Sequence, residues 1–499
     1  AVLARRRPRC LCWREQGVLS MLKSWLLRWH RSLAIVAVIP ILAWSLTGLL
    51  HPVMSRWQPS AIAMKPPADL FAAPVGTTWS DFPAPAKTLP AGMQLRELRA
   101  LTWQNQPYWM LQTSTGERRY FNARNGKPAA IEPAIIEALA RHYTGVTTPI
   151  SSVREVRQFD DEYVFVNRYL PVWRVAFDQP DGLVAFIEPR SLQLTGLSDT
   201  WKTRFSALFA NLHSWQWWPH EPSRDWAMVF FLSLSALVVI SGLVRAASLP
   251  VRQETVVTRR WHRKLGWVVA AAALAWISSA AFHVLVINKA RPSFATYPLA
   301  HSFVSAELES PVPKSELQSA RIQMVATADG PIWRESMVGP MKSTSESSIA
   351  ASHHQHGHQK MPQLLESWVS ARTGERTTPE RYLRELTKEV TGGSAPLSVS
   401  TLTQFSTEYG FVQKRLPVYQ MQFENDVTIY LDPADSAVAS VVSNLDRAEG
   451  FSFAYLHKGH WFDFIGKTAR DAVLAAFALM IFLTACFGVS LLRRTKSSL

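Results

Sequence analysis

Cysteine, charge and nucleotide-binding motifs are all scarce in this chain of 499 residues. It has only 3 cysteines and no CxxC or CxxCH sequence, which excludes a disulfide framework, a zinc ribbon and covalently attached c-type haem. It also has no GxGxxG fingerprint, so the sequence predicts no dinucleotide-binding domain. Charged residues make up 18% and apolar residues 47%, with 20 Trp, a composition that argues against a disordered chain.

Four apolar runs are long enough to cross a bilayer, for which about 20 residues are needed. They are Leu33–Leu50, Trp226–Val244, Leu265–Ile287 and Ala472–Leu492. The predicted segments are a basic N-terminus (1–32), spans at 33–52, 225–245, 265–287 and 470–492, inserts at 53–224 and 288–469, a loop (246–264) and a tail (493–499). The expected fold is a membrane α-helical protein, a four-helix transmembrane bundle with two α+β inserts.

The excess of basic residues lies outside the inserts. The N-terminus, the loop and the tail, counted with Arg245, hold 17 Lys and Arg but only Glu15 and Glu254, which accounts for the whole net charge of +15. Since basic segments stay in the cytoplasm, both termini and the loop are expected there and both inserts across the membrane. The charge therefore indicates topology, and no nucleic-acid partner is expected. Residues 1–20 lack helical periodicity, so Met21 is the expected start of the protein, and no cleavage site follows the first span.

The two halves of the chain repeat one another in order. RWHRSL at Arg28–Leu33 matches RWHRKL at Arg260–Leu265, and LHSWQWW from Leu212 matches LHKGHWF from Leu456. In the inserts, QFDDEYVFVNRYLPVWRVAF from Gln158 matches QFSTEYGFVQKRLPVYQMQF from Gln404. An internal duplication of a unit of helix, insert and helix explains the ordered series, and sites in such repeats form where the halves meet.

Each insert is expected to be α+β. The first predicts a helix at Pro133–Tyr143, strands at Val164–Phe177 and Leu183–Glu188 around a turn at Gln179–Gly182, and an earlier hairpin of Gln106–Thr113 and Arg118–Phe121. The second repeats the helix at Pro379–Val390 and the strands at Leu416–Phe423 and Val427–Leu431. Ser343–Gln359 is rich in Ser and His and is expected to be a loop.

Six histidines form three duplicated pairs at the ends of the spans: His30 and His262, His51 and His283, His213 and His457. A single boundary histidine is usually an interfacial polar group, but ionisable groups near a bilayer in duplicated register indicate function. Two neutral imidazoles from facing helices supply both axial ligands of a haem iron. His30 and His51 are about 31 Å apart along a helix, so a pair at each face would make a transmembrane electron-transfer path. A zinc site would need three or four ligands close together.

Other candidates are weaker. The run His353, His354, His356 and His358 is a possible weak metal-binding loop, although a solvated loop without fixed geometry is the better interpretation. His220 and His460 are spare ligands near the second and fourth spans. Four arginines flank the cytoplasmic pair and suit either haem propionates or membrane anchoring: Arg28, Arg31, Arg260 and Arg263. Four tryptophans are expected in an interfacial belt: Trp215, Trp217, Trp218 and Trp461.

The RWHRSL and TGLL sequences of the first span and LHKG before the fourth resemble the PepSY-associated transmembrane-helix family, and both inserts resemble PepSY modules around YLPVWRVAF and RLPVYQMQF. The resemblance covers nearly the whole chain from Met21. It implies an oxidoreductase of the bacterial inner (plasma) membrane, similar to ferrisiderophore reductases, with b-type haem in a four-helix domain. Electrons would pass from the cytoplasmic side to a ferric siderophore in the periplasm, and iron(II) would be released.

The resemblance also implies roles for single residues. His30 matches the HR motif, His262 its repeat, and His457 the LHxG motif, whereas Ser214 and Trp215 depart from that motif after His213. We expect two haem b groups, or three. His30 and His262 would hold one on the cytoplasmic side. For the other side His51 with His283 is the first choice, and His213 and His457, each with a neighbouring helix, are the alternative.

No catalytic acid, base or nucleophile is expected, because reduction of a ferric chelate needs only an electron, and hard oxygen donors bind iron(II) less tightly. Relatives with fused reductase domains carry their own donor, so this chain would use a separate cytoplasmic donor or quinol. Two other functions compete. One is a membrane-anchored periplasmic PepSY binding or regulatory protein without redox activity. The other is a metal-ion binder or transporter that uses the His-rich loop, although no intramembrane acidic residue marks an ion path.

Overall fold

The computed structural model describes residues 12–164, 167, 169–248, 256–287, 297–298, 301–314, 321–337, 365–406, 408–410, 415–432 and 437–494. They divide into two compact units. The helical unit comprises the chain up to Trp57, Arg204–Arg291 and Leu445 onward. The sheet unit comprises Gln58–Thr203 and Pro292–Asn444.

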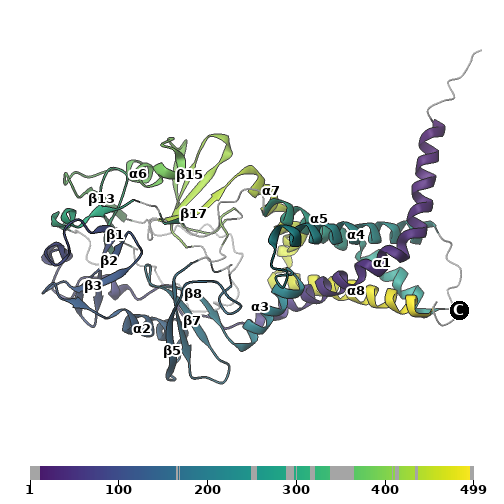
Figure 1. The fold of residues 1–499 in the computed structure, drawn as a ribbon, viewed down its shortest axis with the longest axis horizontal. Helices are drawn as coiled ribbons and strands as arrows, with labels where there is room; N and C mark the ends of the chain where they lie inside the picture. Colours follow the sequence, from purple (N-terminus) through teal and green to yellow (C-terminus); the bar gives the residue numbers. More distant parts are fainter. Residues whose placement is uncertain are drawn as a thin grey trace, which may run out of the picture. The chain divides into compact units, whose positions relative to one another are not determined.

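The helical unit is built on four long helices: α1 (Cys12–Trp57), α4 (Glu221–Ser248), α5 (Val257–Ile287) and α8 (Lys467–Arg494) (Figure 1). Each contains a stretch long and apolar enough to cross a membrane, as predicted. α1 and α5 each pack against both α4 and α8, so α1 and α5 stand at opposite corners of the bundle. The helix α1 begins nine residues before Met21, so residues 12–20 are helical although they lack helical periodicity in the sequence.

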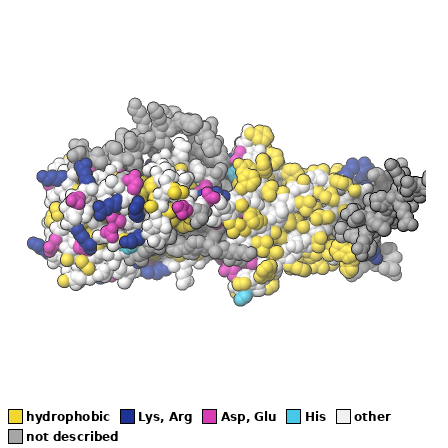
Figure 2. Space-filling model, turned by 90° about the horizontal axis from the view of Figure 1, so that it is seen from above, with side chains coloured by type: hydrophobic (Ala, Val, Ile, Leu, Met, Phe, Trp, Pro, Cys, Tyr) yellow, Lys and Arg dark blue, Asp and Glu magenta, His cyan; other side chains and the backbone are white. Residues whose placement is uncertain are grey.

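The surface of the bundle is apolar. Ile39, Phe230 and Val268 are more than half exposed on three different helices, and Figure 2 shows hydrophobic side chains covering this part of the molecule. Burying such a surface in water-free hydrocarbon is favourable, and the helices satisfy their own backbone hydrogen bonds. The chain is therefore a membrane protein with a lipid bilayer as its environment.

Short helices precede two of the spans. They are α3 (Thr200–Leu212) before α4, and α7 (Asn444–Ser452), a π-helical turn η7 (Phe453–His457) and a 3-10 helix η8 (His460–Ile465) before α8. Among its described residues, the sheet unit has five further 3-10 turns: η1 (Ala68–Leu70), η2 (Trp79–Asp81), η3 (Ala86–Thr88), η5 (Ser305–Glu309) and η6 (Glu424–Asp426).

Strands of both inserts form one eight-stranded sheet. The first insert supplies β1 (Gln94–Trp103), β2 (Gln106–Thr113), β3 (Arg118–Asn122) and β4 (Pro128–Ala129), and the second supplies β10 (Phe303–Val304), β11 (Arg321–Val325), β12 (Ile332–Met337) and β13 (Leu365–Ser370). β1 pairs antiparallel with β11, through Leu98 opposite Met324. The predicted hairpin is confirmed as β2 and β3, and strands of the two inserts pair within this one sheet.

Each insert also has its own smaller antiparallel sheet. In the first, α2 (Glu132–Thr144) is followed by β5 (Ile150–Val156), β6 (Val172–Phe177), β7 (Val184–Glu188) and β8 (Gln193–Ser198). In the second, α6 (Pro379–Thr391) is followed by β14 (Ser398–Leu402), β15 (Val418–Gln422), β16 (Thr428–Asp432) and β17 (Ala437–Val442), with β9 (Tyr297–Pro298) at the edge. The predicted helices are confirmed. The strand predicted from Val164 begins only at Val172.

The two insert helices have matching end signals. Proline stands in the first turn of both helices, where its missing N–H costs nothing, and Gly145 and Gly392 end them in the left-handed conformation. α2 buries Ile135, Ile136 and Leu139 in a core shared with the large sheet and the first small sheet. α6 contributes Tyr382 and Leu383 to the corresponding core of the second insert.

A buried ion pair joins the two inserts. Arg415 donates to the Glu188 carboxylate (3.0 Å) and lies over the Tyr169 ring, 4.1 Å from its centroid. Burial raises the pKa of Glu188, but Arg415, Arg190 and two hydrogen bonds from Ser191 outweigh it and lower that pKa to about 2.

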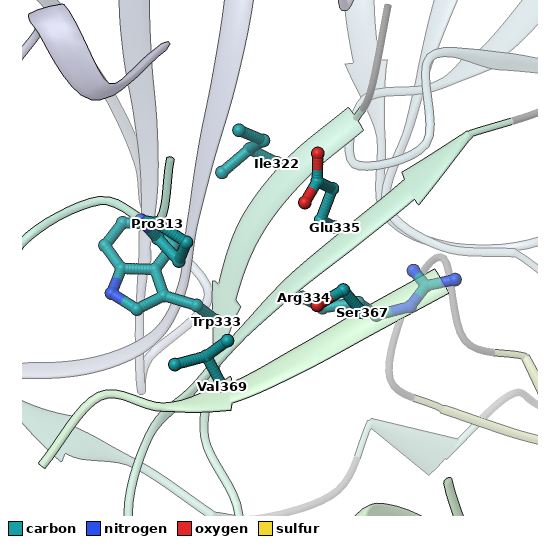
Figure 3. A pocket seen from close by; sticks show the side chains of 7 residues that line it. All are labelled: Pro313, Ile322, Trp333, Arg334, Glu335, Ser367 and Val369. Carbon is teal, nitrogen blue, oxygen red and sulfur yellow. The ribbon is translucent and has the colours of Figure 1, made fainter. Parts of the chain in front are cut away.

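The sheet unit also contains a small hollow against β11, β12 and β13 (Figure 3). Trp333, Pro313 and Val369 gather on one side of it. Arg334 follows Trp333 on β12, and its guanidinium is paired with the Glu366 carboxylate. The hollow is therefore no candidate site, and the histidines of the helical unit remain the chemically distinctive groups.

Candidate functional site

His30 and His262 lie at the end of the bundle where the chain passes from α4 to α5, called here the loop end. His30 of α1 makes a 2.9 Å hydrogen bond between its Nδ1 and Ser241 Oγ of α4. His262 of α5 makes a 2.9 Å hydrogen bond between its Nδ1 and the Thr484 carbonyl of α8. Each imidazole thus bridges to a neighbouring helix, and the two helices that carry them are diagonal in the bundle.

A glycine faces each of these imidazoles. A Cβ on Gly242 would lie 3.1 Å from Cε1 of His30, and a Cβ on Gly488 would lie 3.3 Å from Cε1 of His262. Both distances are tighter than ordinary van der Waals contact. The glycines therefore allow the rings to lie directly against the backbones of α4 and α8, which fixes where each imidazole sits.

The other four histidines converge at the opposite end of the bundle, called here the insert end because the helices lead there to the inserts. The rings of His213 and His457 meet edge to face with centroids 6.3 Å apart. Phe209 lies between His213 (4.3 Å) and His51 (5.8 Å). Phe453 lies in the same way between His457 (4.9 Å) and His283 (5.0 Å). Six rings therefore run from His51 in one half to His283 in the other.

The two phenylalanines are residues that sequence reasoning missed. The signal is present as FANLH at Phe209–His213 and FAYLH at Phe453–His457. In the second half the Phe453 carbonyl accepts from the Lys458 N–H five residues later (2.9 Å), in a π-helical turn of a kind that occurs often at functional sites. In the first half the Phe209 carbonyl accepts from the His213 N–H (2.8 Å), as in an α-helix, and from the Ser214 N–H at 3.4 Å. In both halves the phenylalanine stacks on the histidine four residues later.

Each half tethers a different one of its two insert-end histidines. In the first half, His213 Nδ1 makes a 2.9 Å hydrogen bond with Thr47 Oγ1 of α1. In the second half, Ser279 occupies the sequence position equivalent to Thr47, but its hydroxyl donates to the Ser452 carbonyl (3.1 Å). There His283 Nδ1 instead makes a 2.5 Å hydrogen bond with the Glu449 carboxylate of α7.

The other two insert-end histidines have no such tether. Within the described part of the chain, Nδ1 of His457 is buried without a hydrogen-bond partner, and the His51 side chain makes no hydrogen bond. His51 and His283, the first choice for the second haem, are not in ring contact. The cross-half contact is made by His213 and His457 instead.

The four tethers all impose the same tautomer. Carbonyl and carboxylate oxygens only accept, so Nδ1 of His262 and of His283 must carry the proton. The Ser241 hydroxyl already donates to the Val238 carbonyl, and the Thr47 hydroxyl to the Ala43 carbonyl. They therefore accept from Nδ1 of His30 and of His213. In the neutral ring each of these four histidines presents an unprotonated Nε2.

Burial keeps the imidazoles of His213 and His457 neutral. Desolvation, with a smaller effect of His51, lowers the pKa of His213 to about 4. Desolvation, followed by the neighbouring His213 and His283, lowers the pKa of His457 to about 3. Both imidazoles are therefore uncharged at neutral pH, which is the form that binds a metal.

Trp215 explains the departure from the LHxG motif. It takes a left-handed conformation with φ 53°, and Gly459, its counterpart in the second half, has φ 65°. The indole stacks on Trp44 at 5.5 Å, and Trp44 donates to the His213 carbonyl (3.0 Å). Trp215 is buried, so its expected place in an interfacial belt is wrong, whereas Trp217 and Trp461 are more than half exposed.

The remaining candidates lie elsewhere. His220 bonds Ser223 at the start of α4 (2.9 Å), and His460 bonds Asp463 (2.6 Å) beside Arg470, so both serve helix beginnings. Arg28, Arg31 and Arg260 are exposed, and Arg263 donates to the Ala246 carbonyl. The run His353, His354, His356 and His358 lies outside the described residues.

The donor set suits a haem iron. In the part of the chain that the structure describes, no three His, Cys, Asp or Glu side chains are grouped to hold a bare metal ion. A haem iron needs only two axial ligands from the protein, because the porphyrin supplies the rest. Nδ1 tethered to an oxygen acceptor, with Nε2 left as the ligand, is the usual arrangement around metal-binding imidazoles. Comparison with protein-family models, with curated proteins and with solved structures finds no match.

Proposed function

We propose that the chain is a b-type haem oxidoreductase of the bacterial inner membrane, built from a duplicated PepSY-associated unit. It would pass electrons from a cytoplasmic donor or quinol to a ferric siderophore in the periplasm. The basic N-terminus, loop and tail support an orientation with the loop end in the cytoplasm. The matching order of α2 and β5–β8 with α6 and β14–β17 supports the duplication.

The observation that carries this proposal is that four histidines each make a hydrogen bond through Nδ1 that leaves Nε2 as the unprotonated nitrogen. A histidine that serves only as an interfacial polar group has no need for an acceptor on Nδ1 that leaves Nε2 unprotonated. His30 and His262 would hold one haem at the loop end, and His51, His213, His283 and His457 would hold the haem or haems at the insert end. A haem bound at each end would supply a one-electron carrier.

The chain's own groups supply orientation and exclusion of water. Ser241, Thr484, Thr47 and Glu449 hold the rings in register through Nδ1. Gly242 and Gly488 let two of the rings lie against neighbouring helices. Phe209 places apolar surface between His51 and His213, and Phe453 does so between His283 and His457. A hollow beside His51 is lined by Leu50, Met54, Phe205 and Leu208.

The test is an absorption spectrum of the purified, detergent-solubilised full chain, oxidised and then reduced with dithionite, with a pyridine haemochrome count. We expect b-type bands and two or three haems per chain. Reduced protein mixed with a ferric hydroxamate should reoxidise, while a ferrous-iron chelator reports the released metal. A colourless protein expressed with ample haem would contradict the proposal and favour a PepSY binding or regulatory protein.

A further inference from the structure

The insert end is asymmetric although the sequence around it is duplicated. Counting back from His457 and from His213, Glu449 and Phe205 occupy equivalent positions in the two halves. Phe205 lies with His51 in an apolar hollow. Glu449 makes a 2.5 Å hydrogen bond with His283 and is only 6% exposed. One half therefore has a buried carboxylate against its histidine where the other half has a phenyl ring.

Glu449 is held in place by its helix. Glu449, Phe453 and His457 follow one another at intervals of four residues, so they line one face of α7 and its π-helical continuation. That face meets α5, where Ser279 and His283 are also four residues apart. Ser279 donates to the Ser452 carbonyl, and the two serine hydroxyls are 3.2 Å apart. The hydrogen bond between Glu449 and His283 is thus set by the register of α7 against α5.

We propose that Glu449 is a positioning residue that fixes His283 as an electron-rich ligand and makes one haem at the insert end differ from the others. The inference rests on the proposed function. A buried carboxylate that accepts from Nδ1–H orients the ring and raises the basicity of Nε2. A more basic axial ligand favours the ferric state, so this haem has a lower midpoint potential than it would have with a neutral acceptor.

The experiment is a potentiometric titration of the haems in the full-length protein and in Glu449→Gln. Glutamine keeps an oxygen acceptor of nearly the same shape but removes the charge. We expect an unchanged haem count and an upward shift of one midpoint potential, with the other potentials unmoved. Glu449→Asp keeps the charge and should shift that potential less. In Glu449→Ala the same haem should be retained about ten- to a hundred-fold less tightly.

One control and one converse substitution test whether the Glu449 carboxylate itself sets the potential. Glu221→Gln removes a carboxylate at the start of α4 that pairs with Arg224 (3.3 Å) and contacts no histidine among its described partners, so it should move no potential. Phe205→Glu places a carboxylate beside His51 and should lower a potential. A Glu449→Gln protein with all its haems and unchanged potentials would overturn the inference, as would an equal shift of every potential. A wild-type protein without haem would instead overturn the proposed function.

Discussion

The rings of His213 and His457 meet edge to face, with an interplanar angle of 84° and centroids 6.3 Å apart. The two residues are 244 positions apart in the sequence and precede different spans. Their contact joins the two halves of the chain at the insert end of the bundle. Within the described residues, no other two of the six boundary histidines are in ring contact.

Replacing His30 with alanine should remove the haem at the loop end. The ring is the only proposed ligand on α1 at that end, so the pyridine haemochrome count should fall by one per chain while the remaining bands persist. His220→Ala is the matched control, since His220 bonds Ser223 at the start of α4, and it should leave the count unchanged. Equal counts in the two variants would contradict a ligand role for His30.

Substituting Gly242 with alanine should displace His30 without weakening the helix. The new Cβ would lie 3.1 Å from the imidazole, while alanine favours a helix by about 1 kcal/mol over glycine. We expect a changed spectrum or a lost loop-end haem with an unchanged melting temperature. Gly266→Ala adds the same atom on α5 in open space and should keep the full spectrum. A normal spectrum in Gly242→Ala would show that the close approach is unimportant.

Thr47→Val should loosen His213 at the insert end. The substitution removes the hydroxyl that accepts from Nδ1 and keeps the shape of the side chain. Loss of such an outer partner costs about ten- to a hundred-fold in metal affinity, so haem transfer to apomyoglobin should be faster. Thr47→Ser keeps the hydroxyl and should release haem at the wild-type rate. The prediction fails if valine and serine behave alike.

The Glu188–Arg415 pair should make the sheet unit sensitive to acid. The pKa of Glu188 is about 2 in the folded protein, below its ordinary value of 4.5. Its stabilising contribution is therefore fully present above that ordinary value and is lost as the pH falls toward about 2. Thermal unfolding of the full chain between these pH values, followed by circular dichroism, should show a progressive fall in melting temperature.

Arg415→Met tests the same pair from the other side. It leaves a buried carboxylate without its main counter-charge, which costs about 3 kcal/mol, and it should flatten the fall in melting temperature with acid. Arg157→Met changes a guanidinium whose side chain is 76% exposed and should leave both the stability and its acid dependence unchanged. A melting temperature that Arg415→Met does not alter would contradict the role assigned to the ion pair.

The sequence by itself determined the features that depend on local pattern. Apolar length predicted the four spans, and the helical pattern of Pro133–Tyr143, repeated at Pro379–Val390, predicted α2 and α6. A duplicated motif put His30, His51, His213 and their counterparts at the ends of helices. All of these are properties of contiguous segments, because helix periodicity and end signals act within a few turns of the chain.

Only the tertiary structure decided which distant groups meet. The sharing of one sheet by both inserts depends on β1 pairing with β11, more than 200 residues away. The tethering of His283 by Glu449, and of His213 by Thr47, depends on which helices are neighbours and in what register. Such contacts are set by packing across the whole bundle. Duplicated motifs that look alike in the sequence therefore acquire different partners in the folded protein.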